Sequence, residues 1–169
     1  MDFEKLLDPF PMKKEGNLIA QSIATDPKYM EELWNFTISD AKASWRAAWV
    51  IDKVYDVDPE IVRPYITKMI ELVPNLENEG KTRHFLKIIS QEPLPDEISG
   101  NFINHCFDLL VSNATAVAVK VHAMQVLYNF SLREPDIQNE LVLILTEQME
   151  NGTAGFCSRG RKILKAIAK

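Results

Sequence analysis

A positively charged residue recurs at nearly constant spacing along this chain, and this repetition constrains the fold more than any single motif. The separations between successive members are 37, 37 and 39 residues, and the members are Arg46, Arg83, Lys120 and Arg159. Each follows a polar turn, which contains Asp40, Glu77 or Asn78, Asn113, or Asn151. Self-similarity with a period of about 20–50 residues is typical of repeat architectures. The sequence therefore predicts several copies of one structural unit.

Apolar residues between these turns recur at helical spacing. In one segment they are Ile61, Tyr65, Met69 and Leu72, at i, i+4, i+8 and i+11, which predicts a long amphipathic helix. Residues 116–121 are rich in β-tolerant side chains, but the helical pattern continues to residue 130, so the whole segment is predicted to be helical. We therefore expect an all-α chain.

Prolines punctuate these helical patterns. Asp26-Pro27 and Asp58-Pro59 each place an N-cap residue before a proline at the first helical position. Leu94-Pro95-Asp96 and Glu134-Pro135-Asp136 indicate two further helix starts. The pattern predicts helices of roughly 10–18 residues joined by short links.

A helix, a turn with Asp or Asn, and a second helix that opens with a small or β-branched residue followed by a cation together resemble the HEAT-repeat family. The resemblance implies an all-α, right-handed α-α superhelix (a HEAT-like, armadillo-type solenoid) of about four helical hairpins. It covers about residues 26–169 of a single domain that spans residues 1–169. The expected repeats are about 26–58, 59–94, 95–134 and 135–169.

Residues 1–25 are expected to form an N-terminal cap, because a repeat cannot bury its own apolar side. In HEAT repeats the turn carboxylate and the cation form a ladder between repeats. The resemblance therefore implies a mainly structural role for Asp40 and Glu77 and for the recurring cations.

The charge and the cysteine usage limit the classes of function. The net charge is −5 and the isoelectric point is about 5.3, which disfavours a general nucleic-acid binder. Cys106 and Cys157 do not form a CxxC pair, and no apolar run approaches the ~18 residues of a membrane span. We expect a cytoplasmic protein with no membrane association, no metal and no cofactor.

The most distinctive local feature is a cluster of tryptophan and charged residues. Trp45 and Trp49 lie four residues apart, which places them on one helix face. Arg46 and Asp52 lie close to them in the sequence. Trp and Arg dominate many binding hot spots, so this cluster predicts a binding patch on the concave face. In the alternative interpretation, one tryptophan packs in the core and Arg46 pairs with Asp40 or Asp52.

Later cations and histidines extend this hypothesis. If they align across repeats they form a basic stripe suited to an acidic peptide or a phosphate backbone, although an ordinary solvated face would have the same composition. These candidates are Arg83, His84, Lys120, His122, Arg159 and Arg161. The equivalent positions of His84 and His122 lack further ligands, so we predict no metal site.

The sequence favours a protein- or peptide-binding scaffold that uses the concave face. No catalytic residue is nominated, because HExxH, GxSxG, P-loop and GxGxxG motifs are absent. The alternative is a DNA-binding enzyme that resembles HEAT-like alkylpurine DNA glycosylases and uses Trp45, Trp49, Asp52 and Arg83. The partner and the oligomeric state stay open, including a dimer formed through the C-terminal helix.

Overall fold

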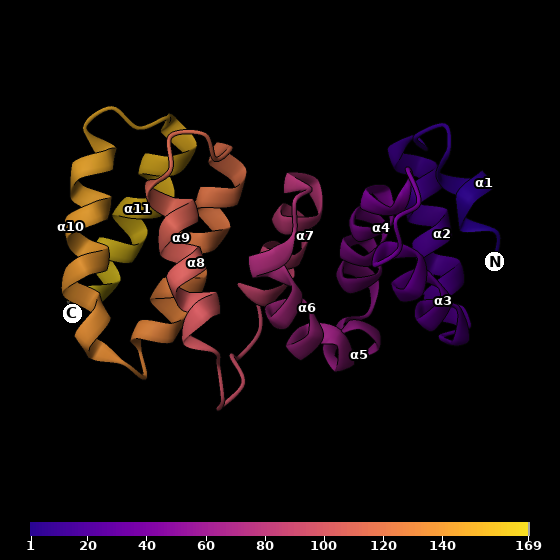
Figure 1. The fold of residues 1–169 in the computed structure, drawn as a ribbon, viewed down its shortest axis with the longest axis horizontal. Coiled ribbons are helices and arrows are strands. Elements are labelled where there is room, and N and C mark those ends of the chain that lie inside the picture. The colour runs from indigo at the N-terminus through magenta and orange to yellow at the C-terminus, as the bar shows by residue number, and fades with distance from the viewer. Residues whose placement is uncertain (169) are drawn as a thin grey trace. The chain divides into compact units, whose positions relative to one another are not determined.

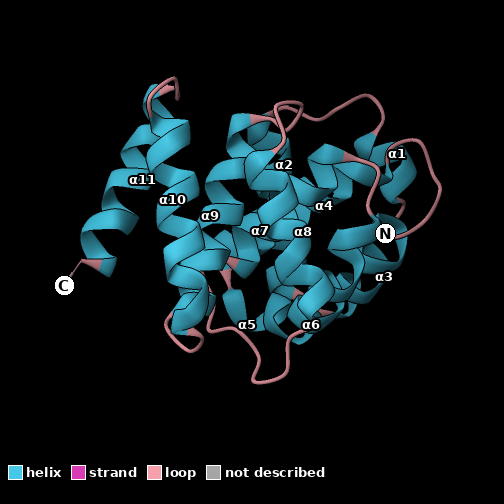
Figure 2. Ribbon diagram, turned by 60° about the vertical axis from the view of Figure 1, so that its left-hand side comes forward, coloured by secondary structure: helices cyan, strands magenta, loops and turns pink. Residues whose placement is uncertain are grey.

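The computed structural model describes residues 1–168, which form helices and turns without any strand (Figure 1 and Figure 2). This confirms the predicted all-α class, whereas the right-handed superhelix stays a prediction. The chain divides into two compact units. Unit 1 comprises residues 1–69 and 76–88, and unit 2 comprises residues 70–75 and the chain from Ile89 onward.

Unit 1 is built around one central helix, α4 (Ser44–Val57), on which α1, α2 and α3 all pack. Its core contains fully buried aliphatic side chains, and Trp34 stacks on Phe85 with ring centroids 5.7 Å apart. The other elements are α1 (Phe3–Leu7), α2 (Lys13–Thr25), α3 (Lys28–Thr37), α5 (Pro59–Val62), η1 (Arg63–Tyr65), the first part of α6 (Ile66–Leu72) and α7 (Glu79–Ile89).

Unit 2 contains two antiparallel helical pairs, coloured from magenta through orange to yellow in Figure 1. Helix α9 (Val117–Ser131) packs against α8 (Gly100–Val111), α10 (Gln138–Met149) and α11 (Ala154–Ile167). The short helices η2 (Val73–Asn75) and η3 (Pro135–Ile137) complete the unit. The predicted helix through residues 116–130 is confirmed as α9, because its apolar side is buried between neighbouring helices.

Helix starts follow the capping oxygens more closely than the prolines. Asp58 caps α5 as predicted, with its Oδ1 accepting from the Glu60 amide at 3.1 Å. The start predicted at Pro95 was wrong, because α8 begins at Gly100 and the hydroxyl of Ser99 accepts from the Asn101 amide at 3.2 Å. A capping oxygen satisfies an amide that the first helical turn leaves free.

The single long helix predicted through residues 61–72 was also wrong. The chain instead forms α5, the 3-10 turn η1 and then α6. Pro64 lies inside η1. Proline has no backbone N–H, and its ring clashes with the carbonyl four residues earlier, so a regular α-helix cannot continue through it. The buried side chains of this segment include Val62, Ile66, Met69 and Val73, whereas Ile61, Tyr65 and Leu72 are only half-buried.

Residues 1–25 form α1 and α2, whose buried side chains include Phe3, Leu7 and Ile23. The link between them, residues 8–12, lies near the N-terminal half of α4, where it contributes to the site described below. Within residues 1–168, no helix is long and apolar enough to cross a membrane. The expected repeat boundaries stay predictions.

Candidate functional site

One side of α4 carries the candidate site in unit 1. Trp45, Trp49, Asp52 and Asp56 are spaced by four, three and four residues, so their side chains emerge on the same side of the helix. The first half of this side is aromatic and the second half is ionic. The two halves are built differently, because only the second contains buried polar side chains, Asp52 and His84.

The aromatic half gathers three rings. Phe10, from the link between α1 and α2, stacks on Trp45 with centroids 5.6 Å apart and an interplanar angle of 8°. The same ring lies 5.1 Å from Trp49 at 40°. Trp45 and Trp49 are both half-buried, and the tryptophan of the core is Trp34, which is 4% exposed. We call Trp45, Arg46 and Trp49 the aromatic cluster, and the Phe10 ring lies on it.

Two glycines allow the indole rings to approach neighbouring helices. A Cβ atom added to Gly16 of α2 would lie 2.1 Å from the nearest ring atom of Trp49. A Cβ atom added to Gly80 of α7 would lie 3.3 Å from Trp45. Carbon atoms in van der Waals contact are about 3.5–4.0 Å apart. The absence of a side chain at Gly16 is therefore a condition for the observed position of Trp49.

Arg46 completes the aromatic cluster. Its Nη1 donates to the Leu7 carbonyl and, at 2.8 Å, to Oδ1 of Asp8. Its guanidinium carbon lies 5.5 Å from the Trp45 centroid and 5.7 Å from that of Phe10, within the range of cation–π attraction. The expected pairing of Arg46 with Asp40 or Asp52 was wrong, because the link to α2 brings Asp8 closer.

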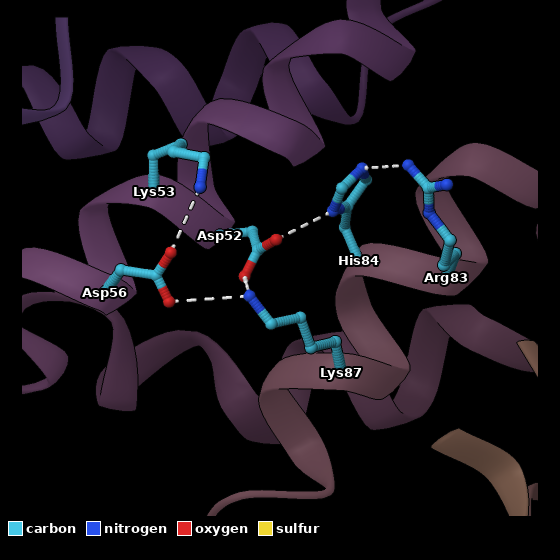
Figure 3. A network of polar contacts seen from close by, with 6 residues as sticks. All are labelled: Asp52, Lys53, Asp56, Arg83, His84 and Lys87. Atoms are coloured by element: carbon cyan, nitrogen blue, oxygen red, sulfur yellow. Dashed lines mark hydrogen bonds and ion pairs between the residues drawn. The ribbon is translucent and has the colours of Figure 1, made fainter. Parts of the chain in front are cut away.

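The ionic half is a network between α4 and α7, shown in Figure 3. Asp52 is 4% exposed, and its two oxygens lie 3.0 Å from Nδ1 of His84 and 2.5 Å from Nζ of Lys87. Lys87 also lies 3.4 Å from Asp56, which accepts from Lys53 at 3.2 Å. The carboxylate of Asp52 therefore connects two helices from a buried position.

The hydrogen bonds of His84 determine its tautomer. Its Nε2 lies 2.9 Å from Nη2 of Arg83, and a guanidinium can only donate. Nε2 must accept, so the proton lies on Nδ1 and is donated to Asp52. Both ring nitrogens are engaged and His84 is only 5% exposed, so in this arrangement it offers no lone pair to a metal or a substrate.

The charges of the network stabilise one another. Burial by itself would raise the pKa of Asp52, but hydrogen bonds from His84 and Lys87 and the charge of Lys87 outweigh burial and lower that pKa. Burial likewise opposes the charge of Lys87, yet Asp52 and Asp56 raise its pKa above the usual value. The ion pair is therefore fully charged at neutral pH, and it holds α4 against α7 in a defined register.

The remaining candidates belong to unit 2 and mostly connect its helices. Lys120 is 9% exposed, its Nζ donates to Oε1 of Gln148 at 3.1 Å, and burial lowers its pKa. Arg159 donates to Oε1 of Gln125 at 2.8 Å. The turn residues expected as ladder partners are thus replaced by amides on neighbouring helices. His122 is half-buried, and Arg161 is exposed.

Lys120 is one of the residues that line a hollow of about 550 Å³ in unit 2. The turns between α8 and α9 and between α10 and α11 both contribute to its lining. Within residues 1–168, no three His, Cys, Asp or Glu side chains gather in an arrangement that could hold a metal ion.

The structure brings together some predicted site residues and adds others. Trp45, Arg46 and Trp49 form one cluster as predicted, and Asp52 joins His84 and Arg83 in the separate network. Asp52, His84 and Lys120 are buried, so they cannot contact a partner directly in this conformation. The residues missed by sequence reasoning are Asp8, Phe10, Gly16 and Gly80.

One signal for the missed residues was present in the sequence. Phe10 stands between Pro9 and Pro11, two residues after Asp8, in a short link of an otherwise helical chain. Because such a link is not helical, apolar spacing does not predict whether an aromatic side chain in it is buried. Its contacts with residues 45–49, more than 30 residues away, appear only in the folded chain.

Comparison with known families agrees with this architecture. A family model described as a HEAT repeat domain matches residues 3–167, which include α1 and α2. No curated protein and no solved structure matches the chain.

Proposed function

Because this chain belongs to the HEAT repeat family, we propose that it is a helical scaffold that binds a protein or peptide partner through the aromatic cluster of unit 1. The observation that carries this proposal is the pair Trp45 and Trp49, half-buried on one face of α4, with the cation of Arg46 over the Trp45 ring. Trp and Arg supply most of the binding energy in many interfaces. A pair of rings kept at the surface is costly unless another surface covers it.

The rigidity of the cluster supports the same function. The rings lie against Gly16 and Gly80, and the buried Asp52 network ties α4 to α7. Side chains that are already held in place lose less conformational entropy when a partner binds. Gly80 of α7 approaches Trp45, and Arg83 follows it three residues later with an exposed side chain that adds a positive charge to this helix. We therefore expect the partner to be acidic or to carry an acidic segment.

The alternative function as a DNA-binding enzyme uses several of the same residues. It requires a carboxylate that faces the substrate, and Asp52 is the candidate. Asp52 is buried and already accepts from His84 and Lys87. No feature of the described residues favours this alternative over a binding scaffold.

The first test is partner capture from the native cell with the tagged chain. We expect Trp49→Ala and Arg83→Glu to reduce capture of the specific partner by at least about tenfold, since truncation of a hot-spot residue costs about 2 kcal/mol or more. Circular dichroism should show that both variants stay folded. If either variant unfolds, or if both capture the partner as well as the wild type, the aromatic cluster is not the binding surface.

A matched glycine pair sharpens this test. Gly16→Ala forces the Trp49 ring to move, because the new Cβ atom would overlap it. Gly155→Ala is the control, because nothing lies within 4 Å of a Cβ atom at that position. We expect Gly16→Ala to shift the tryptophan fluorescence and weaken partner capture, while Gly155→Ala changes neither. Equal capture by both variants would contradict the proposal.

A further inference from the structure

The chain places one of its own segments on the surface proposed for the partner. We define the strap as residues 8–12, the link between α1 and α2. Asp8 of the strap accepts from Arg46, and Phe10 stacks on Trp45 and Trp49. The strap thus offers an acidic group to the cation of the cluster and a phenyl ring to its two indoles.

Few contacts hold the strap in place. Among the described residues, Asp8 to Pro11 take part in no backbone–backbone hydrogen bond, and Pro9 and Pro11 have no backbone N–H to donate. Phe10 is 46% exposed and Met12 is 70% exposed. Pro11 is buried, but a segment without backbone–backbone hydrogen bonds opens at a lower free-energy cost than a helix of the core.

The other side of the strap is not tightly packed either. A hollow of about 400 Å³ lies between the strap and the first turns of α1 and α2. Its lining is mostly apolar and comprises Lys5, Leu6, Pro9, Phe10, Pro11, Glu15, Leu18 and Ile19. Release of the strap from the aromatic cluster therefore uncovers Pro11 and the covered part of Phe10, while the hollow already separates part of the strap from α1 and α2.

The contact between the strap and Arg46 is incomplete. Only Nη1 of Arg46 donates to Asp8, while Nε is buried and has no hydrogen-bond partner in the described chain. A buried donor without a partner costs about 1–3 kcal/mol. A carboxylate that is not tethered to α1 can bind a guanidinium through two parallel hydrogen bonds. An external ligand can therefore satisfy Arg46 better than Asp8 does.

We infer that the strap is a built-in occupant of the binding surface, and that the partner is a peptide with a carboxylate two residues before an aromatic side chain. This inference rests on the proposed function, because it assigns an occupant to the same aromatic cluster. The partner peptide displaces the strap, places its aromatic ring on Trp45 and Trp49, and pairs its carboxylate with Arg46. Because the peptide binds only molecules in which the strap is open, the apparent affinity is the intrinsic affinity multiplied by the open fraction.

The test uses a fluorescein-labelled peptide with the sequence of residues 6–12, and fluorescence polarisation measures its binding to the full chain. Phe10→Ser removes the ring of the strap, and we expect it to bind the peptide about tenfold more tightly than the wild type, as for a site that is about 90% closed. Asp8→Asn keeps Phe10 in place, and we expect a gain of about threefold, typical of losing one exposed ion pair.

Two controls separate the strap from general effects on the surface. Leu18→Ser changes a 54% exposed residue of α2 that lines the hollow, and we expect unchanged affinity. A peptide in which Ala replaces the Phe should not bind any variant. Arg46→Gln should abolish the gain in peptide affinity that Asp8→Asn produces. Arg46 is the cation that pairs with Asp8 in the closed strap and with the carboxylate of the bound peptide.

The outcomes distinguish this inference from the proposed function. Tighter binding by Phe10→Ser and Asp8→Asn, with Leu18→Ser unchanged, supports the strap as an occupant. If no variant binds the peptide more tightly, or if both strap variants unfold, the inference fails. If the strap inference fails but partner capture still depends on Trp49, the proposed function stands. When Trp49→Ala also leaves capture unchanged, both are overturned.

Discussion

At the scale of single residues, Asp52 illustrates how neighbours determine the role of a charged side chain. Its place beside Trp49 in the sequence suggested an exposed binding patch. In the folded chain it is 4% exposed and accepts from His84 and Lys87, which lie 32 and 35 residues away. A carboxylate can be buried at this position only because two donors on α7 compensate the loss of water.

We expect Asp52→Asn to lower the free energy of unfolding by about 3 kcal/mol at pH 7, because it leaves the charge of Lys87 without its closest partner. Urea unfolding followed by circular dichroism measures this difference. Asp56→Asn is the control, since Asp56 has a 45% exposed side chain, and an exposed pair contributes at most about 1 kcal/mol. Equal losses in the two variants would contradict the assigned roles.

The pH dependence of Asp52 has a definite sign. The pKa of Asp52 is lowered in the folded state, whereas an unfolded aspartate titrates near about 3.9. Its stabilising contribution is therefore fully present above the unfolded pKa and is lost as the pH falls through the folded pKa. The free energy of unfolding of the wild type should decline more steeply than that of Asp52→Asn in this acidic window. Parallel curves would be inconsistent with the network.

At the scale of helices, the bonds between neighbouring elements differ from those that the repeat pattern suggested. Arg46, Lys120 and Arg159 do connect neighbouring elements, through amides or a residue of the N-terminal link, whereas Arg83 bonds His84 of its own helix. Lys120 of α9 bonds Gln148 of α10, and Arg159 of α11 bonds Gln125 of α9. A cation at a repeated position can therefore keep its structural role while its partner changes, because any nearby oxygen can accept.

We expect Lys120→Met to leave the free energy of unfolding at pH 7 unchanged or to raise it by up to about 2 kcal/mol. The replacement removes a desolvated cation that has a neutral partner, and apolar replacements of buried charges are often neutral or stabilising. Thermal unfolding measures the effect. Arg161→Met, at an exposed position, should change it by less than about 0.5 kcal/mol. A large loss in Lys120→Met would show that the bond to Gln148 outweighs desolvation.

The difference in stability between the wild type and Lys120→Met should depend on pH in the alkaline range. Burial lowers the pKa of Lys120 in the folded state, so the folded chain carries an unfavourable charge below that pKa. This cost disappears as the pH rises from the folded pKa toward the unfolded value of about 10.4. The wild type should therefore gain stability relative to Lys120→Met over this window. Identical pH profiles would mean that Lys120 is well solvated.

At the scale of the whole molecule, charge separates the proposed scaffold from the DNA-binding alternative. The net charge is −5, and binding to duplex DNA depends mainly on cations that neutralise phosphates. Of the recurring cations, Arg46 already pairs with Asp8, while Lys120 and Arg159 bond amides inside their units. The family match over residues 3–167 fits either function, so charge is the better criterion.

We expect no saturable binding of a fluorescent DNA duplex at 150 mM salt, with any dissociation constant weaker than about 100 μM. Fluorescence anisotropy provides the measurement, and a repeat at 50 mM salt reports the number of phosphate contacts. Micromolar binding with a steep salt dependence would instead favour the glycosylase-like alternative.

Patterns that lie within one turn of the chain predicted the architecture well. The all-α class follows from apolar periodicity, the start of α5 follows from Asp58 before Pro59, and the recurring cations led to the matched family. One error arose at Pro64, where a proline interrupts a segment with helical apolar spacing. The other arose near Ser99, where a capping hydroxyl and not the preceding proline begins the helix. Such features are readable from the sequence because helix formation and capping depend on residues at most about four positions apart.

The candidate site was only half predictable for the opposite reason. The pair Trp45 and Trp49 shares one helix face by spacing, but Phe10 and Gly16 reach them from a different element. Asp52 carries the same sequence signature as an exposed aspartate, and only the approach of α7 makes it a buried ion-pair partner. Burial and pairing depend on distances between helices, which the periodicity of each helix leaves undetermined.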